Sequence, residues 1–321
     1  MAVITVTPAD NISNIIAAAT TNPGDVILAE NGLYRQSVVI TKNNIRIIAR
    51  GDDAIFDGYN MLLSAFTLSN VTGVEIEGFR IIDYTSSGII AGSGGYNRII
   101  GNRIINAGDS GIQLTGTTGN LILRNIAIRC DFDGILMING STRNQVIGNV
   151  TRDNSNNGIE TYLSPDSDNA IIDNKSSGNG SDGFEIYGRN NLLYGNEAYN
   201  NNGRGIYSVS GDMIGIKNEL KGNGNDGAGL FGNNVILFDE ESENNIKSGV
   251  CVLSDYNIVE HSEFKHNHDS GILLEISADF NAVIRNEADD NTTFDISDLG
   301  VSNNFIRNDC KNSNPPGLCM P

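Results

Sequence analysis

The chain has 321 residues and a formal net charge of −18 at pH 7. This charge argues against a nucleic-acid partner, because no basic patch is available to neutralise phosphates. No apolar run approaches the length that spans a membrane, and residues 1–7 lack the charge and apolar core of a signal peptide.

The first predicted elements are a short strand at residues 2–7 and an amphipathic helix after it. Asn11 or Asp10 would cap this helix, whose apolar side would cover the open end of the fold. That side consists of Ile12, Ile15, Ile16 and Ala19. Short strands separated by turns rich in Gly and Asn are expected at 26–28, 37–40, 45–48 and 54–56.

From Ala65 onward the sequence repeats one unit of turn, Gly, strand, loop and Asn. Glycines mark the unit at intervals of 22 to 25 residues: Gly88, Gly111, Gly134, Gly158, Gly183, Gly205, Gly227, Gly249 and Gly271. Asparagines keep the same intervals: Asn102, Asn125, Asn149, Asn174, Asn196 and Asn218. Because the intervals of the glycine series and of the asparagine series change together along the chain, the sequence predicts a solenoid.

A coil of this length with three short strands is typical of a single-stranded right-handed parallel β-helix, an all-β fold. Stacked coils at ~4.8 Å spacing bury a continuous apolar interior. The repeated asparagines would tolerate left-handed turn geometry and hydrogen-bond to their equivalents above and below. We expect an N-terminal strand and capping helix over 1–22, the β-helix over 23–308, and a tail over 309–321 packed on the last coil.

The segment 15–58, IIAAATTNPGDVILAENGLYRQSVVITKNNIRIIARGDDAIFDG, resembles the opening coils of the pectin-lyase-like superfamily. The repeats up to Asn308 extend this resemblance over nearly the whole chain. Members include polysaccharide lyases, polygalacturonases, uronan epimerases, phage tailspikes and non-catalytic surface proteins. The resemblance therefore implies either a secreted enzyme that cleaves a polysaccharide or oligosaccharide, or a glycan-binding surface module, which would be a homotrimer if tailspike-like. It implies an extracellular, cell-surface or virion-surface location.

Polar and aromatic residues gather on the predicted outer face of three adjacent coils. The second and fourth residues after each repeat Gly should face outward, and here they are Glu160, Tyr162, Glu185, Tyr187 and Tyr207. Aromatic rings stack on pyranose faces, and carboxylates do acid–base chemistry. Glu160 and Glu185 should lie one rung apart, within ~5 Å of each other. At that distance the repulsion between their charges would raise the pKa of one of them, or the two carboxylates would together hold Ca²⁺. The alternative is that these residues form an ordinary solvated outer face of the β-helix and no functional groove.

The candidate roles follow from these positions. Glu160 and Glu185 form the predicted catalytic or cation-holding pair, and Asp133 and Asp182 in the preceding turns would assist. Arg204 would contact a substrate carboxylate or hydroxyl group, or act as the base in β-elimination. The predicted substrate-binding residues are Tyr162, Tyr187, Tyr207, Gln113 and Asp109.

The segment 130–135, Cys-Asp-Phe-Asp-Gly-Ile, is similar to the Asn-Thr-Asp-Gly stretch of polygalacturonases. This similarity implies a catalytic acid or base at Asp133. The paired aspartate of those enzymes is missing, because the next turn reads Asn156-Asn157-Gly158. Their Gly-His-Gly and Arg-Ile-Lys motifs, and the Tyr-Gly-x-Asp-Pro-His motif of uronan epimerases, are also absent from the sequence.

Two further groups could bind metals. The longest coil carries extra residues at 163–168, where Asp166 and Asp168 could hold Ca²⁺ or make Asx turns in a solvated loop. His261, His266 and His268 could form a transition-metal site, which would make the protein a metal-handling β-helix, or be solvated turn residues.

The four cysteines fall into two kinds of position. Cys310 and Cys319 bracket the tail and could close a loop by a disulfide that fastens the end of the solenoid, or remain two thiols. Cys130 and Cys251 are expected to be buried small apolar residues rather than reactive thiols.

Overall fold

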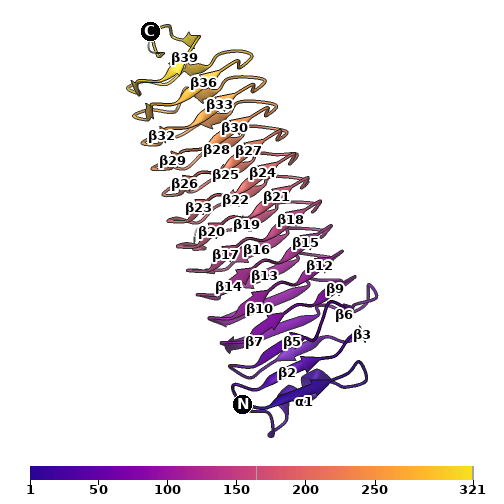
Figure 1. Cartoon of the computed structure of the whole chain (residues 1–321). Coiled ribbons are helices and arrows are strands. Elements are labelled where there is room, and N and C mark those ends of the chain that lie inside the picture. Colours follow the sequence, from indigo (N-terminus) through magenta and orange to yellow (C-terminus); the bar gives the residue numbers. More distant parts are fainter. Residues whose placement is uncertain (164, 320–321) are drawn as a thin grey trace. The chain divides into compact units, whose positions relative to one another are not determined.

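The computed structural model describes residues 1–163 and 165–319, and it confirms the predicted all-β, right-handed parallel β-helix with one short N-terminal helix (Figure 1). The chain divides into two compact units, residues 1–156 and 157–321. In each unit a coil contributes one strand to each of three parallel sheets, which we call A, B and C.

The N-terminal unit contains three sheets of successive strands. Sheet A consists of β1 (Val3–Val6), β2 (Val26–Ala29), β5 (Arg46–Ala49), β8 (Glu75–Glu77), β11 (Arg98–Ile100), β14 (Leu121–Leu123) and β17 (Gln145–Ile147). Sheet B consists of β3 (Gly32–Tyr34), β6 (Ala54–Asp57), β9 (Arg80–Ile82), β12 (Arg103–Ile105), β15 (Ile126–Ile128) and β18 (Val150–Arg152). Sheet C consists of β4 (Val38–Ile40), β7 (Phe66–Thr72), β10 (Ile89–Gly95), β13 (Ile112–Thr115) and β16 (Ile135–Ile138).

The C-terminal unit repeats this plan. Its sheet A consists of β20 (Ala170–Ile172), β23 (Leu192–Tyr194), β26 (Ile214–Ile216), β29 (Ile236–Phe238), β32 (Ile258–Glu260), β35 (Ala282–Ile284) and β38 (Asn304–Ile306). Its sheet B consists of β21 (Lys175–Ser177), β24 (Glu197–Tyr199), β27 (Glu219–Lys221), β30 (Glu241–Glu243), β33 (Glu263–Lys265), β36 (Glu287–Asp289) and β39 (Asp309–Cys310). Its sheet C consists of β19 (Ile159–Thr161), β22 (Phe184–Ile186), β25 (Ile206–Ser208), β28 (Ala228–Leu230), β31 (Val250–Val252), β34 (Ile272–Leu274), β37 (Ile296–Asp298) and β40 (Ser313–Asn314).

The N-terminal helix α1 spans Ile12–Ala17 and is capped as predicted. The Asn11 side chain accepts a hydrogen bond from the backbone N–H of Asn14 at 2.9 Å. Ile12 and Ile16 are fully buried, whereas Ala19 is exposed. The buried side is therefore narrower than predicted, because the helix ends before Ala19.

The repeated asparagines form buried ladders, as the intervals predicted. Asn196 Nδ2 donates to Asn218 Oδ1 at 3.0 Å and to the Ile171 carbonyl at 2.9 Å, and Asn174 Nδ2 donates to Asn196 Oδ1 at 3.0 Å. One expectation was wrong: the left-handed backbone lies one residue earlier, as at Asp173 (φ 52°) and Gly195 (φ 64°). The ladder asparagines thus close the turn through their side chains rather than through positive φ.

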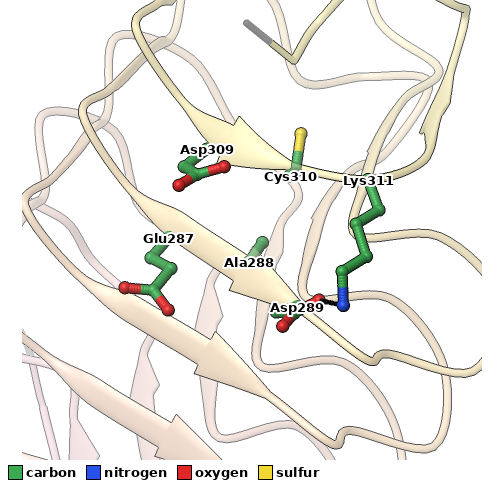
Figure 2. A pocket seen from close by; sticks show the side chains of 6 residues that line it. All are labelled: Glu287, Ala288, Asp289, Asp309, Cys310 and Lys311. Atoms are coloured by element: carbon green, nitrogen blue, oxygen red, sulfur yellow. Dashed lines mark ion pairs between the residues drawn. The ribbon is translucent and has the colours of Figure 1, made fainter. Parts of the chain in front are cut away.

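The C-terminal tail continues the stack. β39 pairs with β36, and β40 pairs with β37. A disulfide joins Cys310 to Cys319, and Lys311 Nζ lies 2.5 Å from Asp289 Oδ1 beside a shallow depression of about 180 Å³ (Figure 2).

Cys130 and Cys251 are buried and not disulfide-bonded, and burial raises the pKa of each thiol to about 12. No helix in the described ranges is long and apolar enough to cross a membrane.

Candidate functional site

The site centres on one outward column of sheet C in the C-terminal unit. Parallel pairing puts Glu160 of β19 opposite Glu185 of β22, and Glu185 opposite Tyr207 of β25. Their strand neighbours point inward, and Phe184 and Ile206 are fully buried. The period-2 alternation of each strand thus places the three side chains on successive rungs, ~4.8 Å apart. We call them the Glu160–Tyr207 column.

Asn157 joins the two glutamates. Its Nδ2 donates to Glu160 Oε2 at 3.0 Å and to Glu185 Oε2 at 2.6 Å. Its Oδ1 accepts a hydrogen bond from the backbone N–H of Asp182 at 2.9 Å, which fixes the orientation of the amide. Because one nitrogen serves both carboxylates, the two oxygens lie no more than about 5.6 Å apart, close to the separation of carboxylate pairs that act together on a glycosidic bond.

The two glutamates differ in exposure. Glu160 is only 2% exposed, so it is far less accessible than its outward position suggested, whereas Glu185 is half-buried. Burial, and then the nearby charges of Glu160 and Asp182, raise the pKa of Glu185 to about 7. Glu185 is therefore the accessible carboxyl that can carry a proton near neutral pH.

Arg204 lies beside the column between two buried aspartates. Its backbone N–H donates to Asp182 Oδ1 at 2.5 Å, and its Nε donates to Asp226 Oδ2 at 3.3 Å. Burial raises the pKa of both aspartates, while Arg204 opposes that rise. The Arg204 stem occupies the space above Gly229, where an added Cβ would lie 2.5 Å from Nε. Glycine at this rung therefore lets the guanidinium lie across the sheet.

Aromatic rings border the column in two pairs. Tyr162 and Tyr187 have ring centroids 6.2 Å apart, and Tyr207 and Phe231 pack edge to face at 4.9 Å. The Arg204 guanidinium carbon lies 4.6 Å from the Tyr207 centroid. Burial, and then the charge of Glu185, raise the pKa of Tyr187 to about 12, so its hydroxyl stays protonated. These rings offer the flat surfaces on which sugars stack.

The structure adds residues to which sequence reasoning gave no role in the site: Asn157, Asp226, Gly229 and Phe231. Asn157 stands three residues before Glu160, a spacing that could have drawn attention to it. Phe231 occupies the same outward position in its coil as Tyr162 and Tyr187 do in theirs. The Arg204–Gly229 contact had no sequence signal, because it depends on how a side chain from one coil lies over the next.

Three predicted residues belong to the N-terminal unit. Asp133 is fully buried, and its Oδ1 accepts a hydrogen bond from Asn156 Nδ2 at 2.9 Å. Ser87 Oγ contacts Gln113 Oε1 at 2.9 Å and Asp109 Oδ2 at 3.1 Å. Gln113 and Asp109 thus share one hydroxyl in this unit, and Asp133 is not exposed for contact with a ligand.

The residues considered for metal binding are engaged in other contacts. Asp166 is buried, and its Oδ2 accepts a hydrogen bond at 2.9 Å from the backbone N–H of Leu163, three residues earlier, rather than from a residue two positions later as in an Asx turn. Asp168 has a φ of 58° and contacts Asn190 Nδ2 at 3.3 Å. Ser164, within the same insertion, lies outside the described residues.

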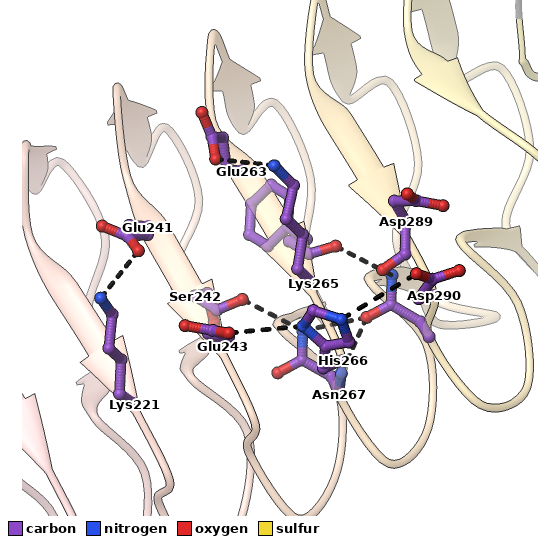
Figure 3. Close-up of polar contacts among 12 residues, drawn as sticks. Lys221, Glu241, Ser242, Glu243, Glu263, Lys265, His266, Asn267, Asp289 and Asp290 are labelled. Atoms are coloured by element: carbon purple, nitrogen blue, oxygen red, sulfur yellow. Dashed lines mark hydrogen bonds and ion pairs between the residues drawn. The ribbon is translucent and has the colours of Figure 1, made fainter.

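Each of the three histidines contacts a different group, and His268 Nδ1 lies 3.1 Å from the Asn245 carbonyl oxygen. His266 Nδ1 lies 3.3 Å from Glu243 Oε1, and its Nε2 lies 3.9 Å from Asp290 Oδ2 (Figure 3). His261 Nδ1 instead lies 3.2 Å from Glu260 Oε1. Within residues 1–163 and 165–319 there is no group of three or more His, Cys, Asp or Glu side chains placed to hold a metal ion.

The three-stranded coil and its parallel pairing define a right-handed parallel β-helix protein of the pectin-lyase-like superfamily. A sequence model described as "Right handed beta helix region" matches residues 162–319. The model described as "Periplasmic copper-binding protein (NosD)" matches residues 50–226, more than half of the chain. The chain therefore belongs to the NosD family. No curated protein gives a significant sequence match.

Solved structures with the same fold include proteins named for action on polysaccharides and a phage protein. The chain is similar to the A-module of the mannuronan C-5 epimerase AlgE6 of Azotobacter vinelandii, with a TM-score of 0.69 and 15% identity over 95% of this chain and 94% of that one. It is similar to the catalytic domain of a GH87 α-1,3-glucanase, with a TM-score of 0.61 and 11% identity over 97% of this chain and 67% of that one. It is also similar to ORF18 of Geobacillus virus E2, with a TM-score of 0.52 and 15% identity over 95% of this chain and 61% of that one. At these identities the likeness establishes the fold alone.

Proposed function

We propose that the protein is carbohydrate-active and cleaves an extended polysaccharide bound over the Glu160–Tyr207 column, with Glu185 as the proton donor. The observation that carries this proposal is the half-exposed Glu185 carboxyl, whose pKa of about 7 lets it hold a proton at neutral pH. The polysaccharide-acting proteins of the same fold support the substrate class.

The proposed step is protonation of the glycosidic oxygen by Glu185 as the carbon–oxygen bond to the leaving sugar breaks. In hydrolysis, water then attacks the anomeric carbon and gives one of its protons to the Glu185 carboxylate, which restores the acid. In β-elimination, a base removes the proton next to the uronate carboxyl group and a double bond forms; Arg204 can accept that proton only as a neutral guanidine, after its ion pair with Asp226 has opened and its own proton has left to solvent. Protonation of the leaving oxygen is common to both reactions, so the role of Glu185 does not depend on the choice between them.

The surrounding residues have supporting roles in this proposal. Glu160 is too buried to reach a sugar, and its charge helps to keep Glu185 protonated. Tyr162, Tyr187 and Tyr207 would stack on successive sugar rings. The Arg204 guanidinium, held by Asp226, would donate hydrogen bonds to a substrate hydroxyl or carboxylate group.

We place the protein outside the cytoplasm. The family description names a periplasmic protein. The Cys310–Cys319 disulfide agrees with this location, because structural disulfides persist in oxidising compartments.

The test is a panel of neutral and uronate-containing glycans, assayed for release of reducing ends and for the ultraviolet absorbance of unsaturated uronate, with and without a chelator. We expect turnover on one class of glycan, and at least a hundredfold loss in a Glu160→Gln/Glu185→Gln double variant. The control is Glu241→Gln, which changes a glutamate on the outer face of sheet B. Unchanged turnover in the double variant would contradict the assignment, and glycan binding without turnover would favour a non-catalytic surface or phage-tail module.

The family description favours a second candidate, a copper-binding function. Copper sites in proteins use His, Cys and Met side chains. The matched range 50–226 contains no histidine; Cys130, Met137 and Met213 within it are fully buried, and Met61 is its one exposed Cys or Met side chain. The three histidines lie beyond that range, so these residues do not fit a copper site. Calorimetric titration with Cu²⁺ tests this candidate, and tight equimolar binding that His266→Ala abolishes would support it.

A further inference from the structure

One side of sheet A in the C-terminal unit carries almost no charge. The first and third residues of each strand face outward, and on three successive strands they are Leu192, Tyr194, Ile214, Ile216, Ile236 and Phe238. Ile214 is 41% exposed and Tyr194 is 39% exposed. The flanking strands β20, β32 and β35 continue the pattern, with Glu260 as their one charged residue in an outward position. We call these outward positions of β20 to β38 the apolar face.

The apolar face contrasts with sheet B of the same unit. Sheet B follows the same alternation, but its outward positions carry ion pairs such as Lys221–Glu241 at 2.7 Å (Figure 3). Another is Lys265–Glu287, also at 2.7 Å. Single exposed apolar residues are ordinary on protein surfaces, whereas a contiguous patch over successive strands marks an interaction site. The difference between the two sheets is therefore not explained by what a β-helix needs in order to fold.

Charged residues flank the apolar face where its strands begin and end. Arg189 Nη1 lies 3.7 Å from Asp212 Oδ2 before the strands, and Lys217 Nζ lies 3.6 Å from Asp239 Oδ2 after them. An apolar centre with a charged rim is the usual anatomy of a protein–protein interface. The rim pairs satisfy each other within the chain, so a partner needs to supply only apolar surface.

We propose that the apolar face binds the same face of a second copy of the chain, forming a two-fold dimer by face-to-face packing of the two sheets. Each copy carries a net charge of −18, so two copies repel one another wherever both present acids. On the apolar face that repulsion is smallest, and the parallel side-chain columns of the two copies can interdigitate with the sheets ~10 Å apart. A two-fold axis needs one self-complementary patch, which this face provides.

The size of the face sets the strength of the dimer. Seven strands at ~4.8 Å spacing extend over roughly 30 Å. With a width of three residues, the face covers roughly 300–450 Å², about half of one side of a standard interface. We therefore expect a concentration-dependent dimer rather than an obligate one. This inference does not rest on the proposed function.

The experiment is analytical ultracentrifugation of the full chain over a hundredfold range of concentration, at low and high NaCl. We expect a monomer–dimer equilibrium that shifts toward dimer as salt rises, because salt screens the repulsion between copies. An Ile214→Lys/Phe238→Lys double variant should dimerise at least tenfold more weakly. Ile246→Lys and Ile276→Lys change exposed residues outside sheet A and should leave dimerisation unchanged.

A second variant keeps the test decisive if the lysine variant does not fold. β29 is the middle strand of the seven, so Phe238→Cys should lie near the two-fold axis and form an intermolecular disulfide on mild oxidation. Ile276→Cys is the matched control and should not, and the native thiols Cys130 and Cys251 are buried. A chain that stays monomeric at every concentration, a trimer, or a dimer insensitive to the lysine substitutions would overturn the proposal.

Discussion

Among single residues, Glu185 and its surroundings determine the proposed chemistry. Its carboxyl shares Asn157 Nδ2 with the buried Glu160, and burial together with the neighbouring acids raises its pKa to about 7. An ordinary surface glutamate would be ionised at that pH and could not donate a proton. The environment, rather than the residue type, therefore defines this candidate acid.

The pH dependence of turnover follows from this pKa. Glu185 is protonated below pH about 7, so activity that needs its proton is present there and is lost as the pH rises through about 7. We expect kcat/KM to fall about tenfold per pH unit above that point. Glu185→Gln should be at least a hundredfold slower and should lack this limb of the profile. A wild-type profile that stays flat from pH 6 to about 9 would be inconsistent with a Glu185 acid.

Sequence alternation was sufficient to place Glu160, Glu185 and Tyr207 in one column, because register in a parallel solenoid follows from the repeat interval. The burial of Glu160 and the bridging by Asn157 were not predictable. Both depend on how the turn before β19 folds onto its neighbours, which no periodic pattern encodes.

Among structural elements, the asparagine ladders hold successive coils together. Asn196 is fully buried, and its side chain makes hydrogen bonds to Asn174, Asn218 and the Ile171 carbonyl. The asparagine intervals revealed these ladders in advance. They did not reveal that the residue before each ladder asparagine takes the left-handed conformation, because Asp, Arg, Lys and Gly all occupy that position.

Removing one ladder amide should destabilise the fold strongly. Asn196→Ala leaves the Asn174 side chain and the Ile171 carbonyl without these partners in a buried position, so we expect a loss of about 3 kcal/mol in the free energy of unfolding. Urea denaturation measures it. Asn304→Ala, at an exposed position of β38, is the control and should change stability by less than about 0.5 kcal/mol. Equal effects of the two substitutions would contradict a structural role for the ladder.

Glu240 interrupts the ladder that runs through Asn218. It is buried, its Oε1 accepts from Asn218 Nδ2 at 2.9 Å, and its Oε2 has no hydrogen-bond partner among the described residues. Burial raises its pKa from 4.5 to about 8. The folded chain therefore keeps this proton while the unfolded chain loses it, so the stability contributed at low pH declines as the pH rises from 4.5 to about 8.

Glu240→Gln should remove this pH dependence, because glutamine has a similar shape and does not ionise. We expect the variant to match the wild type near pH 5 and to exceed it by a few kcal/mol near pH 8.5. Denaturant unfolding at both values measures the difference. Parallel pH dependences for the two proteins would show that Glu240 does not titrate as its burial requires.

For the whole molecule, the repeat made the fold predictable, because each coil buries its apolar residues only against its neighbours. The function was harder to predict than the fold, because epimerases, glucanases and a phage protein have the same fold. In this chain the candidate site coincides with outward polar and aromatic residues at Glu160, Glu185 and Tyr207. The contrast, within the C-terminal unit, between a charged sheet B and a nearly uncharged sheet A also became evident only once the strands were assigned to sheets.

The most direct measurement is a crystal structure of the Glu185→Gln variant with an oligosaccharide from the glycan class that the wild type cleaves. The account predicts a glycosidic oxygen within hydrogen-bond distance of the residue-185 side chain, at ~3 Å, with sugar rings on Tyr187 and Tyr207. An oligosaccharide bound on another face, with the Glu160–Tyr207 column left vacant, would contradict it.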